Sequence, residues 1–174
     1  FLTIIPVRLK AVSQKQVSRS TIFFSLVGYG IGLVLIAGYY ILSFLGIHLY
    51  LLSFALVMML IALTGGLHLD GLADTVDGFS GGSSSRERLA IMRDPHIGTM
   101  GVLSLISALL AKIFLLRTVP IPFFPSALLL MCFLSRWSMV LVMYVFPYAR
   151  KEGKASLFMG GRQPLMFTGA SLIT

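Results

Sequence analysis

Three aspartates are spaced so that a helix would place them on one face: Asp70, Asp74 and Asp77. They lie within the segment GGLHLDGLADTVDG, residues 65–78, which directly follows an apolar run. In a continuous helix, positions i, i+4 and i+7 share a face, and like charges there repel one another. Carboxylate oxygens suit Mg²⁺, which typically takes one or two carboxylates together with waters and substrate phosphates. The spacing therefore predicts that these three side chains hold Mg²⁺ for a phosphorylated substrate.

Acidic residues are scarce elsewhere in this chain of 174 residues. Five of its six Asp and Glu lie between Asp70 and Asp94. The other interpretation of the cluster is a solvated acidic face at a helix end, which needs no ligand. The concentration of acid in one segment favours the functional interpretation. Whether residues 70–77 form one helix stays open, because Gly71 could break it and leave the ligands in a loop.

The composition is that of an integral membrane protein. The chain is 57% hydrophobic and 11% charged, with a mean hydropathy of +0.93, whereas soluble domains average about 25% charged residues. The net charge of +8 does not predict nucleic-acid binding, because the basic residues lie in short connectors between apolar runs and form no stripe. The single cysteine, Cys132, lies in an apolar run, so neither a disulfide nor a cysteine metal site is expected.

The apolar runs predict an all-α, polytopic helical bundle that forms a single membrane domain over residues 1–174. We expect four complete spans and the start of a fifth, which implies that the chain is incomplete at its C-terminus; they are residues 21–45, 47–67, 99–116, 121–146 and 167–174. Glycines in the first span are expected to form a helix-packing surface. Loops 68–98 and 147–166 are polar, and in the first of them Ser85 is expected to cap a short helix.

The basic residues predict the orientation in the bilayer. Eleven of the fourteen Lys and Arg fall in the N-terminal segment and in the loops of residues 68–98 and 147–166. Such a bias places these segments on the cytoplasmic side. An acidic loop and a basic loop on the same side could form one site.

Other titratable residues near the aspartates are candidates for catalysis. Asp94 could complete a metal shell, act as a base, or end a helix before Pro95. His68 and His96 could act as general acids or bases near neutral pH, and His96 is also a candidate for binding substrate phosphate. Two histidines 28 residues apart do not specify a zinc site.

Arginines of the polar loops could bind substrate phosphate, or could only set the topology and meet anionic lipid. They are Arg86, Arg88, Arg93, Arg150 and Arg162. Arg136 differs because it lies within a predicted span. A charge there is costly, so we expect it to pair with a carboxylate or a substrate phosphate.

These motifs closely resemble those of the cobalamin synthase family, the adenosylcobinamide-GDP ribazoletransferases. The resemblance covers nearly all of the chain and rests on GGLHLDGLADTVDG at 65–78, RLAIMRDPHIGT at 88–99, SR at 135–136, YARKEG at 148–153 and GRQ at 161–163. Members of that family continue beyond position 174 and carry a further Gly-Gly-x-Thr-Gly-Asp-like motif, which is not in this sequence.

The resemblance implies a multi-pass enzyme of the cell inner membrane that requires Mg²⁺ and faces the cytoplasm. Such an enzyme transfers the cobinamide phosphate of adenosylcobinamide-GDP to alpha-ribazole, or to its 5'-phosphate, and releases GMP. It implies that Asp70, Asp74 and Asp77 hold the metal and that arginines stabilise the leaving GMP. Self-association, or association with other cobamide-assembly enzymes, stays open.

Three other classes of protein are alternatives. A CDP-alcohol phosphotransferase also releases a nucleoside monophosphate, but Asp74 stands where its Asp-Gly-x-x-Ala-Arg motif has arginine. A transporter could use Asp70, Asp74 and Arg136 as an ion pathway, but would be expected to carry acids deep within its spans. A structural scaffold would not require the acidic cluster.

Overall fold

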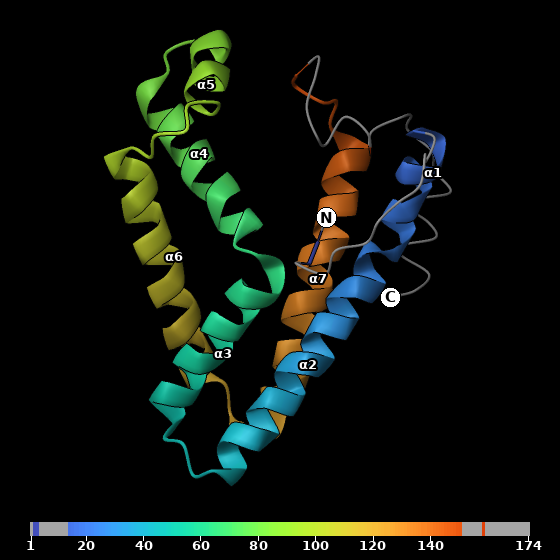
Figure 1. Cartoon of the computed structure of the whole chain (residues 1–174), viewed down its shortest axis with the longest axis vertical. Helices are drawn as coiled ribbons and strands as arrows, with labels where there is room; N and C mark the ends of the chain where they lie inside the picture. The colour runs from blue at the N-terminus through green and yellow to red at the C-terminus, as the bar shows by residue number, and fades with distance from the viewer. Residues whose placement is uncertain (1, 4–13, 151–157, 159–174) are drawn as a thin grey trace. The chain divides into compact units, whose positions relative to one another are not determined.

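The computed structural model describes residues 2–3, 14–150 and 158 of the chain, with only the backbone for residues 14–16. Over these residues every regular element is a helix (Figure 1), as the composition predicts. In order they are α1 (Gln14–Arg19), η1 (Ser20–Phe23), α2 (Phe24–Phe44), α3 (Leu49–Thr64), α4 (Leu67–Gly81), α5 (Ser85–Ile91), α6 (Thr99–Thr118), η2 (Ile121–Phe123) and α7 (Phe124–Val145).

The chain divides into two compact units. The first, here called the α3–α6 unit, contains Leu42–Pro120 together with residues 2–3. The second, here called the α2–α7 unit, contains the described residues 14–41, 121–150 and 158.

The described part of the chain contains three helices that are long and apolar enough to cross a membrane. They run over Val17–Phe44, Thr99–Thr118 and Ile121–Val145, close to the spans predicted at 21–45, 99–116 and 121–146. Such helices make this a multi-pass membrane protein. The predicted start of a fifth span, residues 167–174, lies outside the described residues.

The helix expected over residues 47–67 ends earlier than predicted. α3 stops at Thr64, and Gly65 and Gly66 both have left-handed backbone angles, with φ of 64° and 69°. Glycine adopts such angles at no steric cost, and one left-handed residue is a common way to end a helix. The chain turns by 90° here and continues as α4, so α3 and α4 form a fourth span only if they are counted as one broken span.

The short helix α5 begins one residue earlier than predicted. Ser84 is its N-cap, and the Ser84 hydroxyl accepts a hydrogen bond from the Glu87 N–H at 3.2 Å. The Glu87 carboxylate in turn accepts hydrogen bonds from the Ser83 hydroxyl, at 2.6 Å, and from the Ser83 N–H, at 2.9 Å. The hydroxyl bond is the largest of the interactions that lower the pKa of Glu87 below its ordinary value. With Ser84 as the cap, Glu87 occupies the third helical position that a capping box uses.

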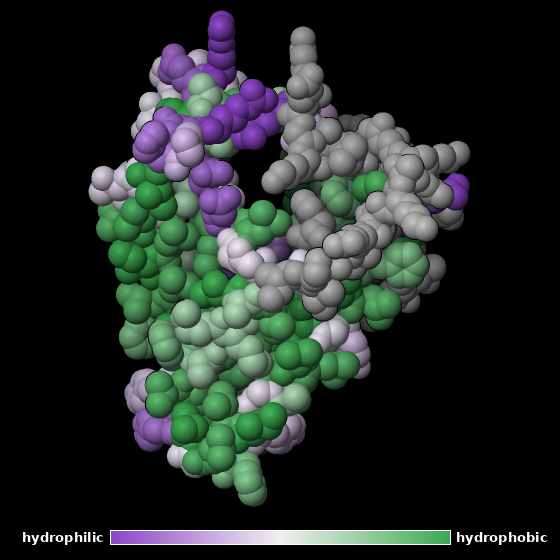
Figure 2. Space-filling model, viewed as in Figure 1, coloured by the Kyte–Doolittle hydropathy of each residue, from purple (hydrophilic) through white to green (hydrophobic). Residues whose placement is uncertain are grey.

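Glycines in α4 and at its C-cap let α5 fold back against α4. A Cβ at Gly78 would stand 2.8 Å from the Cγ of Met92, and a Cβ at Gly82 would stand 2.7 Å from the backbone nitrogen of Arg88. These distances are shorter than van der Waals contact, so neither position has room for a side chain. Figure 2 shows that hydrophilic residues gather over α4 and α5, whereas hydrophobic residues cover α3 and α6. The α4–α5 end of the α3–α6 unit is therefore its polar end.

In the α2–α7 unit, α2 and α7 pack closely through small residues. A Cβ at Gly28 would lie 2.5 Å from the carbonyl oxygen of Cys132, and Cys132 is itself buried. Tyr39 of α2 stacks on Phe124 of α7, with ring centroids 4.7 Å apart. The predicted packing role of the glycines is confirmed at Gly28, whereas a Cβ at Gly30 would meet nothing within 4 Å.

This difference gives a matched test of the α2–α7 contact. Gly28→Ala should lower the free energy of unfolding by about 1–3 kcal/mol, because the added methyl overpacks a backbone contact. Gly30→Ala should be neutral or stabilising by up to about 1 kcal/mol, since alanine favours helix. Unfolding of the purified protein in mixed micelles by rising SDS would measure both. Equal losses in the two variants would contradict the packing assigned to Gly28.

Candidate active site

The three aspartates lie on one continuous helix. α4 runs unbroken from Leu67 to Gly81, so Gly71 does not interrupt it. Asp70 lies in the first turn of α4, where a negative charge is favoured by the helix dipole. Asp70 is exposed, and Asp74 and Asp77 are half-buried.

Asp77 binds the start of α6 and does so with both carboxylate oxygens. Its Oδ2 accepts a hydrogen bond from the Gly98 N–H and its Oδ1 accepts one from the Gly101 N–H, each at 2.7 Å. The first N–H groups of a helix have no partner within the helix. Gly98, the N-cap residue of α6, has no side chain to cap them, so Asp77 supplies that function from α4.

Asp94 and His96 form a second pair in the loop between α5 and α6. The Asp94 Oδ1 lies 2.6 Å from the His96 Nδ1 and also accepts the His96 N–H at 2.9 Å. The backbone N–H of His96, followed by its imidazole, lowers the pKa of the Asp94 carboxyl below its ordinary value. The side chains are 89% exposed for His96 and 55% exposed for Asp94, so a substrate can reach both.

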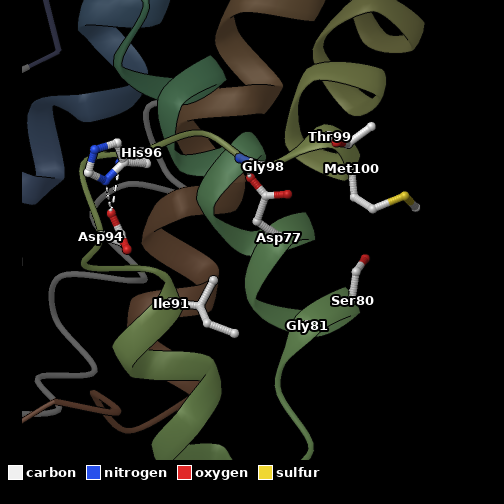
Figure 3. Close-up of a pocket in the computed structure, with 9 residues that line it drawn as sticks. All are labelled: Asp77, Ser80, Gly81, Ile91, Asp94, His96, Gly98, Thr99 and Met100. Carbon is white, nitrogen blue, oxygen red and sulfur yellow. Dashed lines mark hydrogen bonds and ion pairs between the residues drawn. The ribbon is translucent and has the colours of Figure 1, made fainter.

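These residues line one pocket of about 330 Å³ at the polar end of the α3–α6 unit (Figure 3). In the close-up, Asp77 points toward Gly98 from α4, while the hydrogen-bonded Asp94 and His96 lie on the α5–α6 loop. The lining consists of Asp77, Ser80, Gly81, Ile91, Asp94, His96, Gly98, Thr99 and Met100. A carboxylate–imidazole pair beside a pocket can accept a proton from a bound hydroxyl group.

The pocket brings together three of the predicted site residues, Asp77, Asp94 and His96. Asp70, Asp74 and the exposed His68 lie nearer the start of α4 and do not line it.

In the described residues, no three His, Cys, Asp or Glu side chains are grouped closely enough to hold a metal ion. Both oxygens of Asp77 are already hydrogen-bonded. The other two carboxylates of the motif, those of Asp70 and Asp74, lie one helical turn apart on α4. Two carboxylates fit an ion that completes its shell with waters and substrate phosphates.

The arginines of the α3–α6 unit differ in their surroundings. Arg88 is tied to its own unit, since its Nε donates to the Gly82 carbonyl at 3.0 Å and its guanidinium lies 4.8 Å from the Phe79 ring centroid. Arg86 and Arg93 are exposed and available to an anion. Arg88 therefore has a structural explanation that Arg86 and Arg93 lack.

The remaining predicted arginines belong to the α2–α7 unit. Arg136 is only 4% exposed, and its Nη1 donates to the Ser135 hydroxyl at 2.7 Å. Its Nε and Nη2 have no hydrogen-bond partner among the described residues, so the expected carboxylate partner is not present there. Arg150 is half-buried, and Arg162 lies outside the described residues.

Two glycines that contact Asp77 are not among the residues predicted for the site. Gly98 and Gly101 provide the N–H groups that Asp77 binds. A signal for them exists, because two glycines three residues apart at the start of an apolar run leave that helix without a side-chain cap of its own.

Comparison with known proteins gives the family. The cobalamin-5-phosphate synthase family model matches residues 1–174. Proteins named adenosylcobinamide-GDP ribazoletransferase are 37% identical in Desulforamulus reducens, over 88% of this chain and 61% of that protein, and 37% identical in Escherichia coli, over 99% and 73%. The protein of that name in Citrobacter koseri is 39% identical, over 91% of this chain and 66% of its own length. No solved structure matches. The chain belongs to the cobalamin-5-phosphate synthase family.

Proposed function

We propose that this protein is an adenosylcobinamide-GDP ribazoletransferase of the cell inner membrane, with its active site on the cytoplasmic side. The observation that carries the proposal is that relatives with this name align with 88–99% of the chain at 37–39% identity. The chain spans 61% of one of these relatives and 73% of another. The bias of basic residues toward the polar loops supports the cytoplasmic orientation.

The reaction transfers the cobinamide phosphoryl group from the phosphate of GMP to a ribose hydroxyl of the ribazole. The 3'-hydroxyl of alpha-ribazole, or of its 5'-phosphate, attacks the phosphorus that carries the cobinamide. A new P–O bond forms to the ribazole oxygen, and the P–O bond to the bridging oxygen of the diphosphate breaks. The bridging oxygen leaves with its electron pair on GMP, and the product is a phosphodiester that joins cobinamide to ribazole.

The Asp94–His96 pair accepts the proton of the attacking hydroxyl. With Nδ1–H donated to the Asp94 carboxylate, the His96 Nε2 carries a lone pair and serves as the base. The anionic Asp94 stabilises the imidazolium that results. The low pKa of Asp94 keeps it ionised at neutral pH, as this role requires.

Asp70 and Asp74 are the residues that would hold Mg²⁺. When bound, Mg²⁺ would neutralise negative charge on the diphosphate oxygens. Arg86 and Arg93 are exposed on the same unit and can bind phosphate oxygens of the leaving nucleotide through paired N–H groups.

GMP release tests the proposal directly. Purified full-length protein in detergent micelles should release GMP from adenosylcobinamide-GDP only when alpha-ribazole 5'-phosphate and Mg²⁺ are both present. One phosphodiester product should form per GMP, and EDTA should stop the reaction. A folded preparation that releases no GMP would refute the proposed function, and CMP release from a CDP-alcohol would favour the phosphotransferase alternative.

A further inference from the structure

The Asp77 carboxylate is already hydrogen-bonded at both oxygens, unlike a carboxylate that is available to ligate a metal ion. Both of its oxygens accept backbone N–H groups at 2.7 Å, from residues 21 and 24 positions later in the chain. Hydrogen bonds to a carboxylate are stronger than those between neutral groups, and a negative charge is favoured at a helix N-terminus. A metal ion that drew Asp77 away would leave the buried Gly101 N–H without a partner, which is costly.

The surroundings of Asp77 are shaped to its carboxylate. A Cβ at Gly98 would stand 2.5 Å from the Asp77 Oδ1, and a Cβ at Gly101 would collide with the Oδ2. The same Cβ at Gly101 would lie 3.2 Å from the carbonyl oxygen of Ala73, on the preceding turn of α4. The carboxylate therefore fills a space that exists because residues 98 and 101 have no side chain.

The loop that Asp77 holds is the one that carries the proposed base. Gly98 lies two residues after His96, and both line the pocket. Fixing the Gly98 N–H on α4 therefore restrains the path of the loop on which the Asp94–His96 pair lies.

We propose that Asp77 is a positioning residue, which fixes the α5–α6 loop and the start of α6 against α4, and that it does not ligate the metal. This role rests on the proposed function, because the group that it positions is the base of that reaction. Asparagine at position 77 could accept a hydrogen bond from one of the two N–H groups, but its NH₂ group would face the second N–H, and two donors cannot bond to each other. It would therefore loosen the loop without removing a metal ligand.

Hydrogen exchange and Mn²⁺ binding test this role without turnover. In the full-length protein in micelles, Asp77→Asn should speed backbone exchange over residues 97–102 by about 10-fold or more. The dissociation constant for Mn²⁺, used as a paramagnetic substitute for Mg²⁺, should change less than about twofold, whereas Asp74→Asn should raise it about 10-fold or more. Unchanged exchange in Asp77→Asn, or a loss of Mn²⁺ affinity as large as that of Asp74→Asn, would overturn the proposal.

Kinetics of the same variant distinguish misplacement from loss of binding. Asp77→Asn should lower kcat by about 10–100-fold, because a small misplacement of the catalytic base slows the reaction. The KM and the Mg²⁺ concentration that gives half of the maximal rate should change little. A higher Mg²⁺ requirement would overturn the proposal. If the wild-type protein releases no GMP, the proposed function fails, while the exchange and Mn²⁺ results still decide the role of Asp77.

A pair of substitutions tests the space between Asp77 and Gly98. Gly98→Ala should speed exchange over residues 97–102, because its methyl displaces the carboxylate. In an Asp77→Ala background the same change should have a several-fold smaller effect, since the carboxylate is gone. Gly71→Ala is the matched control, because its Cβ would meet nothing within 4 Å. An equal effect of Gly98→Ala in both backgrounds would overturn the proposal.

Discussion

Asp74→Asn is expected to lower the rate of GMP release by about 10²–10³-fold, the cost typical of losing one group that contributes to electrostatic stabilisation of the transition state. Asp74 is half-buried on the continuous helix α4, one turn after Asp70. Asparagine has nearly the same shape, so the protein should still insert into the membrane and fold. The loss follows from the missing charge, which Mg²⁺ needs among its ligands. GMP release at saturating substrate, over a range of Mg²⁺ concentrations, measures it.

The control for Asp74→Asn is Glu87→Gln, another neutralised carboxylate in the α3–α6 unit. Glu87 accepts hydrogen bonds from Ser83 at the start of α5 and does not line the pocket. Glu87→Gln should leave the rate of GMP release within about twofold of the wild-type rate, as expected of a substitution at the surface. Undiminished turnover by Asp74→Asn, with the variant found in the membrane fraction at the wild-type level, would remove Asp74 from the site.

His96→Gln is expected to lower kcat by about 10²–10⁴-fold, the contribution typical of a general base, with little change in KM. Glutamine can occupy the same space but cannot take a proton at neutral pH. Asp94→Asn should cost less, because Asp94 acts through the imidazole that it orients at 2.6 Å. Steady-state rates of GMP release at several concentrations of alpha-ribazole 5'-phosphate give kcat and KM for each variant.

A double variant that carries both Asp94→Asn and His96→Gln tests whether the two residues act together. Residues that act as one unit have non-additive effects, so the double variant should be no slower than His96→Gln alone. His48→Gln is the matched control, because His48 precedes α3 and stacks on Tyr50 with ring centroids 5.5 Å apart, away from the pocket. Losses that multiply in the double variant, or a His96→Gln enzyme with normal kcat, would contradict the role of the pair.

The sequence predicted the helices well because hydropathy alone decides most of them. The runs near residues 21–45, 99–116 and 121–146 became helices with nearly the predicted ends. The end of α3 was misplaced because Leu67 continues the apolar run, and hydropathy does not respond to a backbone turn. The turn is marked instead by the consecutive glycines Gly65 and Gly66, which adopt left-handed φ angles of 64° and 69°.

The site was predictable in its residue types and only partly in its contacts. The sequence left open whether Asp70, Asp74 and Asp77 lie on one helix, and the structure places all three on the continuous α4. The sequence could not indicate that Asp77 binds N–H groups on α6, because this contact joins segments 21 residues apart. The Asp94–His96 pair is local, with partners two residues apart, yet its geometry depends on the turn between α5 and α6.

The 90° turn after α3 has a consequence for the lipid around the protein. At 1.5 Å per residue, the 16 residues of α3 reach about 24 Å, which is less than the ~30 Å of hydrocarbon in a typical bilayer. An α3 that stands upright from one boundary of the hydrocarbon would therefore begin the acidic helix several ångströms below the opposite headgroups, unless the bilayer thins locally to meet it. Acyl-chain length thereby becomes a variable that sets how far Asp70 lies below the headgroups, and a thicker membrane would hinder the access of any water-soluble substrate to this residue.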